Sequence, residues 1–263
     1  MQKNSPIGIF DSGFGGLSVA RAIRAALPGE DICYAADCGY APWGDRNDDY
    51  INERVDVIVG FLRQKNVKAI VIACNTATAV TVKRLRELWE FPIIGIEPAV
   101  MLAQKKTRNR KVGVLATTKT LSSRKYHLLC DRTAEDLDII NCPCPGLMEC
   151  VEAGDMHSAA TTALLHTYID PLRSQGVDTL VLGCTHYPFL SEAIREVAGK
   201  DIALIDPAPA VAKQLVRRLL ETGLLSMKKA GGTEEFYSTD ANPAREKVLQ
   251  TLWTPEAKLQ TIC

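Results

Sequence analysis

The sequence lacks the long apolar segment that a membrane-spanning helix needs, since it contains no run of about 18 consecutive apolar residues. It also lacks an excess of charge, because 31 Lys and Arg residues balance 31 Asp and Glu residues. A nucleic-acid partner is therefore not expected, because nucleic-acid-binding domains carry a basic footprint. The N-terminal residues show no basic stretch followed by an apolar one, so no secretory signal is expected. These absences predict a cytoplasmic protein without a membrane partner.

The nine cysteines lack the paired C-x-x-C spacing of structural zinc sites. Cys142 and Cys144 are separated by a single residue, and Cys33 lies five positions before Cys38. Their number is odd, whereas disulfide-rich exported domains are small and usually have an even number of cysteines. We therefore expect reduced thiols and no metal site.

Strand-like and helix-like segments alternate along almost the whole chain. Short apolar runs rich in Val and Ile predict buried strands, and segments with apolar residues three and four apart predict helices. The alternation indicates βαβ units and parallel sheets, and thus an α/β fold. Strands are expected at residues 6–10, 31–36, 69–73, 92–96, 111–116, 137–141, 179–183, 202–205 and 235–239. Helices are expected at residues 17–27, 51–62, 78–89, 122–130, 146–153, 158–172, from 188 onward, 208–221 and 243–253.

The two halves of the chain resemble each other. The sequence IGIFDS at residues 7–12 is similar to VGVLAT at 112–117, and AIVIACNT at 69–76 is similar to TLVLGCTH at 179–186. This internal duplication predicts two similar, pseudo-symmetric α/β domains with parallel sheets and an active site in the cleft between them. Because residues 202–206 look like a return crossover, we expect a first domain of residues 1–97 and 207–263. The second domain is expected to comprise residues 98–206.

Reactive side chains stand where the predicted strands end. Ligands of open α/β sheets bind beyond the carboxyl ends of the strands. Asp11, Cys74 and Cys184 each follow a strand, and the two cysteines occupy matching places in the two halves. Since side chains alternate along a strand, Cys74 and Thr76 are expected to point together, as are Cys184 and His186.

A glycine-rich loop at residues 13–16 follows the first predicted strand. It does not match the G-x-G-x-x-G dinucleotide pattern, because Ser18 stands where the third glycine would be. Two interpretations stay open. The loop is either a tight turn before a helix or a helix N-terminus that offers backbone N–H groups to a small anion such as a carboxylate.

Two thiols across a cleft suit the inversion of a stereocentre that bears a hydrogen. This reaction needs a base on one face of the carbon and an acid on the other. Ordinary thiols have a pKa near 8.5 and are only a few per cent ionised at neutral pH, so an acid–base neighbour helps. Asp11 is predicted to serve Cys74, and His186 to serve Cys184. Alternatively, His186 is only a hydrogen-bonding cap at the end of its strand.

Three segments resemble the glutamate racemases of the cofactor-independent aspartate/glutamate racemase superfamily. These segments are GIFDSGFGG at 8–16, ACNTA at 73–77 and GCTHYP at 183–188, and the similarity thins after about residue 225. The resemblance implies that Cys74 takes the α-proton from D-glutamate and that Cys184 takes it from L-glutamate. It also implies supporting catalytic roles for Asp11, His186 and Glu152.

The resemblance further implies a set of substrate contacts. The family's Pro-Tyr-Gly loop corresponds here to residues 42–44, with Trp43 in place of the tyrosine, and Glu149 replaces a common proline in the segment before Glu152. Thr117 and Thr120 are additional candidates. The implied substrate-binding residues are Asp11, Ser12, Trp43, Gly44, Asn75, Thr76, Thr185 and His186.

The expected function is therefore that of an isomerase that interconverts L- and D-glutamate without cofactor or metal. It would supply D-glutamate for peptidoglycan synthesis, and so for cell wall biogenesis and cell shape. Three alternatives stay open: an aspartate racemase, a nucleophilic hydrolase using Cys184 and His186, and a non-catalytic regulator that binds gyrase. A homodimer is compatible with the resemblance. The chain lacks the N-terminal extension of some nucleotide-activated members, which argues against that form of regulation.

Overall fold

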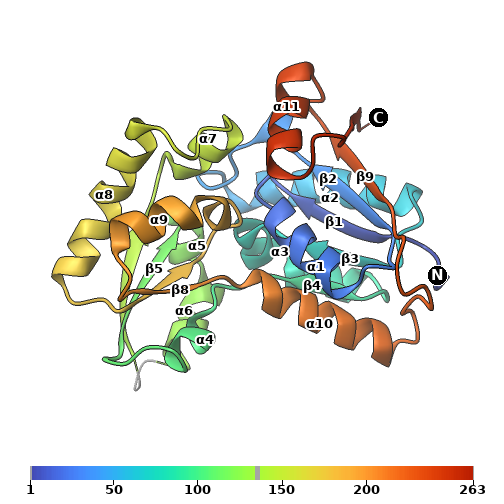
Figure 1. The fold of residues 1–263 in the computed structure, drawn as a ribbon. Helices are drawn as coiled ribbons and strands as arrows, with labels where there is room; N and C mark the ends of the chain where they lie inside the picture. Colours follow the sequence, from blue (N-terminus) through green and yellow to red (C-terminus); the bar gives the residue numbers. More distant parts are fainter. Residues whose placement is uncertain (1, 134–136, 263) are drawn as a thin grey trace.

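The computed structural model describes residues 2–133 and 137–262. In this part of the chain the strands form two separate sheets, and all strand pairs are parallel (Figure 1). The first sheet has the order β10-β9-β2-β1-β3-β4 and the second has the order β6-β5-β7-β8. The strands of the first sheet are β1 (Ile7–Asp11), β2 (Ile32–Ala36), β3 (Ala69–Ile72), β4 (Ile93–Gly95), β9 (Glu234–Ser238) and β10 (Leu259–Thr261). Those of the second are β5 (Lys111–Ala116), β6 (Asp138–Pro143), β7 (Thr179–Leu182) and β8 (Ala203–Ile205).

The two sheets share one topology. The order β2-β1-β3-β4 in the first sheet corresponds to β6-β5-β7-β8 in the second. The registers correspond as well, because Ile7 pairs with Ala69 in one sheet and Val112 pairs with Thr179 in the other. The predicted α/β class with two similar parallel sheets is confirmed. The domain limits at residues 97/98 and 206/207 stay a prediction.

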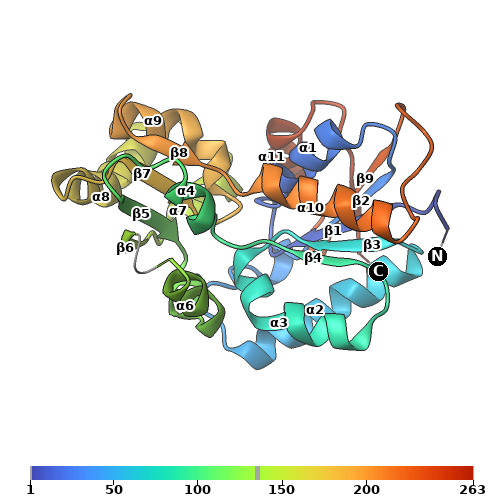
Figure 2. The same ribbon diagram turned by 90° about the horizontal axis from the view of Figure 1, so that it is seen from below.

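Helices cover both faces of the first sheet (Figure 2). Side chains of a strand alternate between faces, so Ile7 and Ile9 pack with α1 (Leu17–Ala26) and α10 (Ala208–Glu221). Phe10 points the other way and packs with α2 (Asp48–Gln64), on the face that also carries α3 (Asn75–Leu88). The core is therefore built from strands that are apolar on both faces, as buried parallel strands are.

The second sheet is covered in the same manner. Leu180 and Leu182 of β7 lie in one apolar cluster with α8 (Ala159–Ser174) and α9 (Ser191–Ala198). Val112 and Val181 lie in another cluster with α4 (Val100–Gln104) and α6 (Arg124–Asp131). The remaining α-helices of the described chain are α5 (Thr118–Ser122), α7 (Leu147–Glu152) and α11 (Pro243–Leu252). No helix in residues 2–133 and 137–262 is both long and apolar enough to cross a membrane.

Three short elements carry no sequence signal that predicts them. The helices α4 and α5 have five residues each and β10 has three, so none is long enough to show a period. The helix expected from residue 188 begins instead as a 3-10 turn, η2 (Tyr187–Leu190), before α9 starts at Ser191.

A buried ion pair stabilises the first sheet at the edge where its strands begin. Lys68, just before β3, donates to a carboxylate oxygen of Glu30, and both side chains are buried. The Lys68 ammonium also donates to the carbonyl of Lys3 at 2.5 Å, and Glu30 Oε1 accepts from the backbone of Ser226 at 2.7 Å. The pair therefore joins the N-terminal segment, the loop before β2 and the loop before β9.

Replacing Lys68 by Met should lower the free energy of unfolding by about 3–5 kcal/mol, because a buried carboxylate loses its counter-charge. The double variant Lys68→Met/Glu30→Leu should recover most of the loss, since it removes the second charge as well. Urea denaturation measures both. The exposed pair of Lys83 and Glu87 is the control, and Lys83→Met should change stability far less. Equal losses for Lys68→Met and Lys83→Met would contradict the argument.

Candidate active site

A cleft opens where the carboxyl ends of the two sheets meet. Its walls come from the segments that follow β1, β3, β5, β6 and β7, and from the loop after β2. Both predicted catalytic cysteines, Cys74 and Cys184, line it. The predicted residues that also line it are Ser12, Trp43, Gly44, Asn75, Thr76, Thr117, Thr185 and His186. Glu149, for which no role was predicted, lines it as well.

Cys74 caps the N-terminus of α3. Its sulfur accepts from the backbone N–H of Ala77 at 3.4 Å and lies 3.7 Å from Ser12 Oγ. Burial and the nearby charge of Asp11 raise the pKa of the Cys74 thiol, against the opposing effect of these two hydrogen bonds. Cys74 therefore rests as a neutral thiol. The N–H group and the helix N-terminus stabilise the thiolate when it forms.

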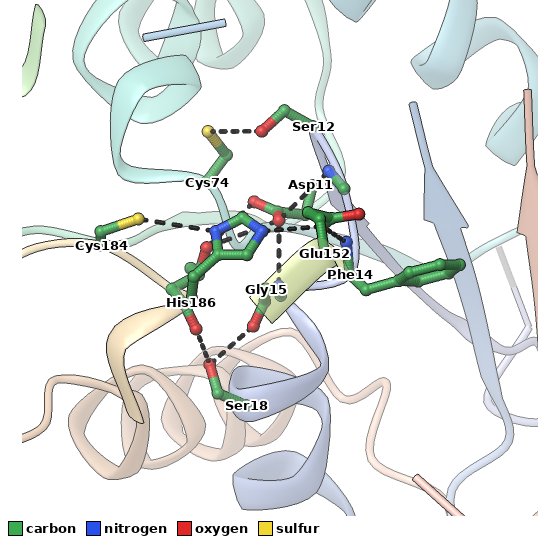
Figure 3. A network of polar contacts seen from close by, with 12 residues as sticks. Asp11, Ser12, Phe14, Gly15, Ser18, Cys74, Glu152, Cys184 and His186 are labelled. Carbon is green, nitrogen blue, oxygen red and sulfur yellow. Dashed lines mark hydrogen bonds and ion pairs between the residues drawn. The ribbon is translucent and has the colours of Figure 1, made fainter. Parts of the chain in front are cut away.

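Cys184 has a histidine beside it. Its sulfur lies 3.6 Å from His186 Nδ1, and His186 Nε2 lies 2.8 Å from Glu152 Oε1 (Figure 3). Burial alone would lower the pKa of His186, but hydrogen bonds to Cys184 and Glu152 outweigh it and raise that pKa well above its ordinary value. The imidazole is thus a strong enough base to take the thiol proton of Cys184.

Glu152 is the last residue of α7 and lies almost fully buried. Its Oε1 also accepts from the backbone N–H of Phe14, in the loop after β1, at 2.6 Å. Burial would raise the pKa of this carboxyl, but the bonds to His186 and Phe14 and the charge of Arg245 lower it. Glu152 is therefore ionised at neutral pH.

Asp11 lies at the end of β1, fully buried. Its Oδ2 accepts from the backbone of Gly16 at 3.0 Å and of Gly13 at 3.4 Å, and Thr185 Oγ1 lies 3.4 Å from both carboxylate oxygens. Burial raises the pKa of Asp11, although the charge of His186 opposes it. No hydrogen bond of the described residues joins Asp11 to Cys74. The influence of Asp11 on this thiol that the structure shows is electrostatic, because its charge raises the pKa of Cys74.

The glycine-rich loop binds carboxylates of the protein itself. Its N–H groups donate to the carboxylates of Asp11 and Glu152. These contacts match the interpretation of the loop as a helix start that offers N–H groups to a carboxylate. A side chain at Gly15 would collide with the ring of His186, so only glycine fits there. Ser18 Oγ donates to the carbonyls of Gly15 and Thr185, at 2.9 Å each, which ties the loop to the segment of Cys184 (Figure 3).

Hydroxyl groups and two unpaired polar side chains complete the cleft. Thr76 Oγ1 lies 3.1 Å from Thr117 Oγ1 and 3.4 Å from Thr120 Oγ1, which joins the two halves. Both polar side-chain atoms of Asn75, and the Nε1 of Trp43, are buried without a hydrogen-bond partner among the described residues. A buried polar atom without a partner is costly, so these two side chains are the candidates to bond a ligand in the cleft. Asn75 offers a donor and an acceptor together.

The expected alternation of side chains at the strand ends is wrong. Strand β3 ends at Ile72 and β7 ends at Leu182, so neither cysteine lies in its strand. Cys74 begins a helix that contains Thr76, and Cys184 meets His186 because the chain turns between them. Cys184 and His186 do lie together as predicted, but a turn of the chain brings them together rather than strand alternation.

Sequence reasoning missed part of the wall. Cys144 lines the cleft one residue after β6, and its carbonyl accepts from the Tyr187 hydroxyl at 3.2 Å. Its place after a strand is the same sequence signal that marks Asp11. Met148, on α7, shows no such signal. In the described part of the chain, no cluster of three or more His, Cys, Asp or Glu side chains could hold a metal ion.

Comparison with known proteins identifies the family. A family model described as Asp/Glu/hydantoin racemase matches residues 16–215. The chain belongs to the Asp/Glu/hydantoin racemase family. The expected resemblance to glutamate racemases is confirmed as well. The glutamate racemase of Pseudomonas entomophila is 48% identical over 261 residues, which cover 99% of this chain and 98% of that protein.

Solved structures of other racemases share the fold over the full length. The Bacillus anthracis glutamate racemase RacE1 superposes with a TM-score of 0.91 at 34% identity, over 100% of this chain and 98% of that one. The Escherichia coli glutamate racemase, solved with L-glutamate and an activator, superposes with a TM-score of 0.88 at 31% identity, over 98% of each chain. The predicted two-sheet architecture of this racemase is thus that of its relatives.

In this racemase the Glu152 carboxylate should stabilise the fold in a pH-dependent manner. Its pKa is lowered in the folded state, so its contribution is present above the ordinary value of 4.5 and is lost as pH falls through the folded value. Glu152→Gln should lower the free energy of unfolding at pH 7 by about 3–5 kcal/mol, because His186 and Arg245 lose their counter-charge.

Urea denaturation at pH 7 and pH 4 checks this, and the difference from the unaltered protein should shrink at pH 4. Glu221→Gln, at an exposed ion pair of α10 with Arg218, is the matched control. A loss for Glu152→Gln that is the same at both pH values would contradict the assignment.

Proposed function

We propose that this chain is a glutamate racemase that moves the α-proton of glutamate between two thiols, Cys74 and Cys184. The observation that carries the proposal is the placement of one cysteine after the third strand of each duplicated unit, with both lining one cleft. Inversion needs a base on one face of the α-carbon and an acid on the other. The names of the relatives supply the substrate class.

In the direction from L- to D-glutamate, Cys184 acts as the base and Cys74 as the acid. His186 takes the thiol proton of Cys184, and the resulting thiolate removes the α-proton of L-glutamate. The neutral thiol of Cys74 then donates its proton to the opposite face of the carbanion. In the reverse direction the two sulfurs exchange roles, and the N–H group of Ala77 stabilises the Cys74 thiolate.

The unpaired groups of the cleft suit an amino acid substrate. Asn75 can donate to a carboxylate and accept from the ammonium group. The hydroxyls of Ser12, Thr76 and Thr185 and the backbone of Gly44 supply additional contacts on the same walls. Such fixed donors stabilise the charge that develops on the carboxylate when the α-proton leaves. Trp43 replaces the family's tyrosine and still presents one donor, its Nε1.

The proposed reaction uses only acid–base groups of the chain, so it invokes no cofactor or metal. We place the enzyme in the cytoplasm, where a reducing environment suits the eight free cysteines of the described residues. Its product would be the D-glutamate of peptidoglycan. A homodimer and an interaction with gyrase stay predictions.

Removal of either thiol should abolish racemisation. Cys74→Ala and Cys184→Ala should each lower kcat by about 10²–10⁴-fold, because each direction needs both the acid and the base. Circular dichroism of L- and D-glutamate solutions measures the rate. Cys130→Ala, a half-buried thiol on α6 away from the cleft, is the matched control and should retain full activity. Full activity of Cys74→Ala would refute the two-thiol mechanism, and a trapped acyl-enzyme on Cys184 would favour a hydrolase.

The substrate should be glutamate rather than aspartate. One methylene group changes discrimination by about 10–200-fold, so kcat/KM for glutamate should exceed that for aspartate by at least about tenfold. Parallel assays with both amino acids measure the ratio. A ratio of one or below would instead identify an aspartate racemase.

A further inference from the structure

A guanidinium from the first-sheet side of the molecule reaches the Glu152 carboxylate. Arg245 lies in the first turn of α11, and its Nη1 donates to Glu152 Oε2 at 3.0 Å. Figure 1 shows α11 and α7 at the same end of the molecule. The two helices come from different halves of the chain, since α11 follows β9 of the first sheet and α7 follows β6 of the second. The end of α7 also lies near the apolar side of α11, because a Cβ added at Gly154, two residues after Glu152, would lie 3.9 Å from Val248 Cγ2.

Residues just before α11 hold Arg245 in place. Its Nε donates to Asp240 Oδ2 at 3.3 Å, and its backbone N–H donates to Asn242 Oδ1 at 3.0 Å at the start of α11. About a quarter of the side chain is exposed, whereas Glu152 has 10% exposure. The guanidinium is therefore fixed between two carboxylates and directed at the buried one.

The two oxygens of Glu152 have different partners. Oε1 receives the N–H groups of Phe14 and His186, while Oε2 receives Arg245. A carboxylate that is bonded at both oxygens cannot rotate about its terminal bond. Without Arg245, Oε2 would lose its cationic partner, and the carboxylate would be held only through Oε1.

We propose that Arg245 is a positioning residue for the Cys184 side of the reaction. It fixes the Glu152 carboxylate, and this carboxylate holds the His186 ring with Nδ1 directed at the Cys184 sulfur. Arg245 does not line the cleft, and no hydrogen bond of the described residues joins it to the Cys184 sulfur, so it acts through Glu152. The inference rests on the proposed racemase function. It also makes full activity depend on the contact of α11 with α7, because a side chain from one half completes the acid–base groups of the other.

The kinetic test compares Arg245→Gln with Arg245→Lys. Loss of the ion pair should lower kcat/KM by about 10–100-fold, as small misplacements of a catalytic group do. The loss must be equal in both directions, because the equilibrium constant between the enantiomers is one. Arg245→Lys keeps the charge and should recover a large part of the activity. Lys247→Gln removes the same charge from an exposed position of α11 and should leave the activity unchanged.

The pH profile separates positioning from mere structural support. A positive charge beside Glu152 favours its ionised form, so Arg245→Gln should move the acidic limb of kcat/KM to higher pH. Arg245→Lys should move it much less. The titratable groups that face Glu152 from the elements around it, besides Arg245, are His186 after β7, Asp11 of β1, Tyr34 of β2 and Cys38 of the 3-10 turn η1 (Cys38–Tyr40).

Two results would overturn the inference while the racemase function stands. One is an Arg245→Gln enzyme with unaltered kinetics and an unaltered pH profile. The other is an equal loss in Arg245→Gln and Arg245→Lys, with an unmoved acidic limb and lower thermal stability, which would mean that Arg245 only holds α11 in place. If the unaltered enzyme racemises neither glutamate nor aspartate, the proposed function itself has failed, and the role of Arg245 fails with it.

Discussion

Glu152 places one buried negative charge between the two sheets, and the acid–base groups of the cleft are arranged around it. The carboxylate accepts from Phe14 on the first-sheet side and from His186 on its own side, and it pairs with Arg245. A buried charge is tolerated only when its partners satisfy it, so these contacts must form together. The same contacts join the two halves of the chain and orient the imidazole beside Cys184. Stability and catalytic geometry therefore depend on one interaction.

The two thiols occupy equivalent places in a duplicated topology, yet their surroundings differ. Cys184 has an imidazole at 3.6 Å, whereas Cys74 has a helix N-terminus and the hydroxyl of Ser12. Both surroundings stabilise a thiolate, one by accepting its proton and the other by hydrogen bonds and the helix dipole. In the proposed mechanism each sulfur acts as the base in one direction and as the acid in the other. Duplication supplied two similar frameworks, and the loops after the strands gave each thiol its own partner.

Much of the architecture could be predicted because it follows from local pattern. Buried strands, their alternation with helices and the reactive residues at strand ends are all visible along the sequence. The contacts that decide the chemistry are not visible in this way, because they join residues that lie far apart in the sequence. Arg245 and Glu152 lie 93 positions apart, and nothing periodic links them. The bonds that the Asp11 carboxylate receives from the glycine-rich loop are likewise not visible in the sequence, because backbone geometry sets them. The role of Asp11 toward Cys74 stays a prediction. The sequence pattern also does not predict the helix cap formed by Cys74, because the expected helix begins only at residue 78 whereas α3 begins at Asn75.

The most direct test of the central claim is to follow early turnover of L-glutamate in deuterated water, without added cofactor. Enantiomers are separated, and deuterium at each α-carbon is measured by NMR and mass spectrometry. With one thiol on each face, the D-glutamate formed first should carry deuterium at the α-carbon while the remaining L-glutamate keeps its proton. D-glutamate that retains the original proton, or deuterium that accumulates equally in both isomers from the start, would contradict a mechanism with two separate bases.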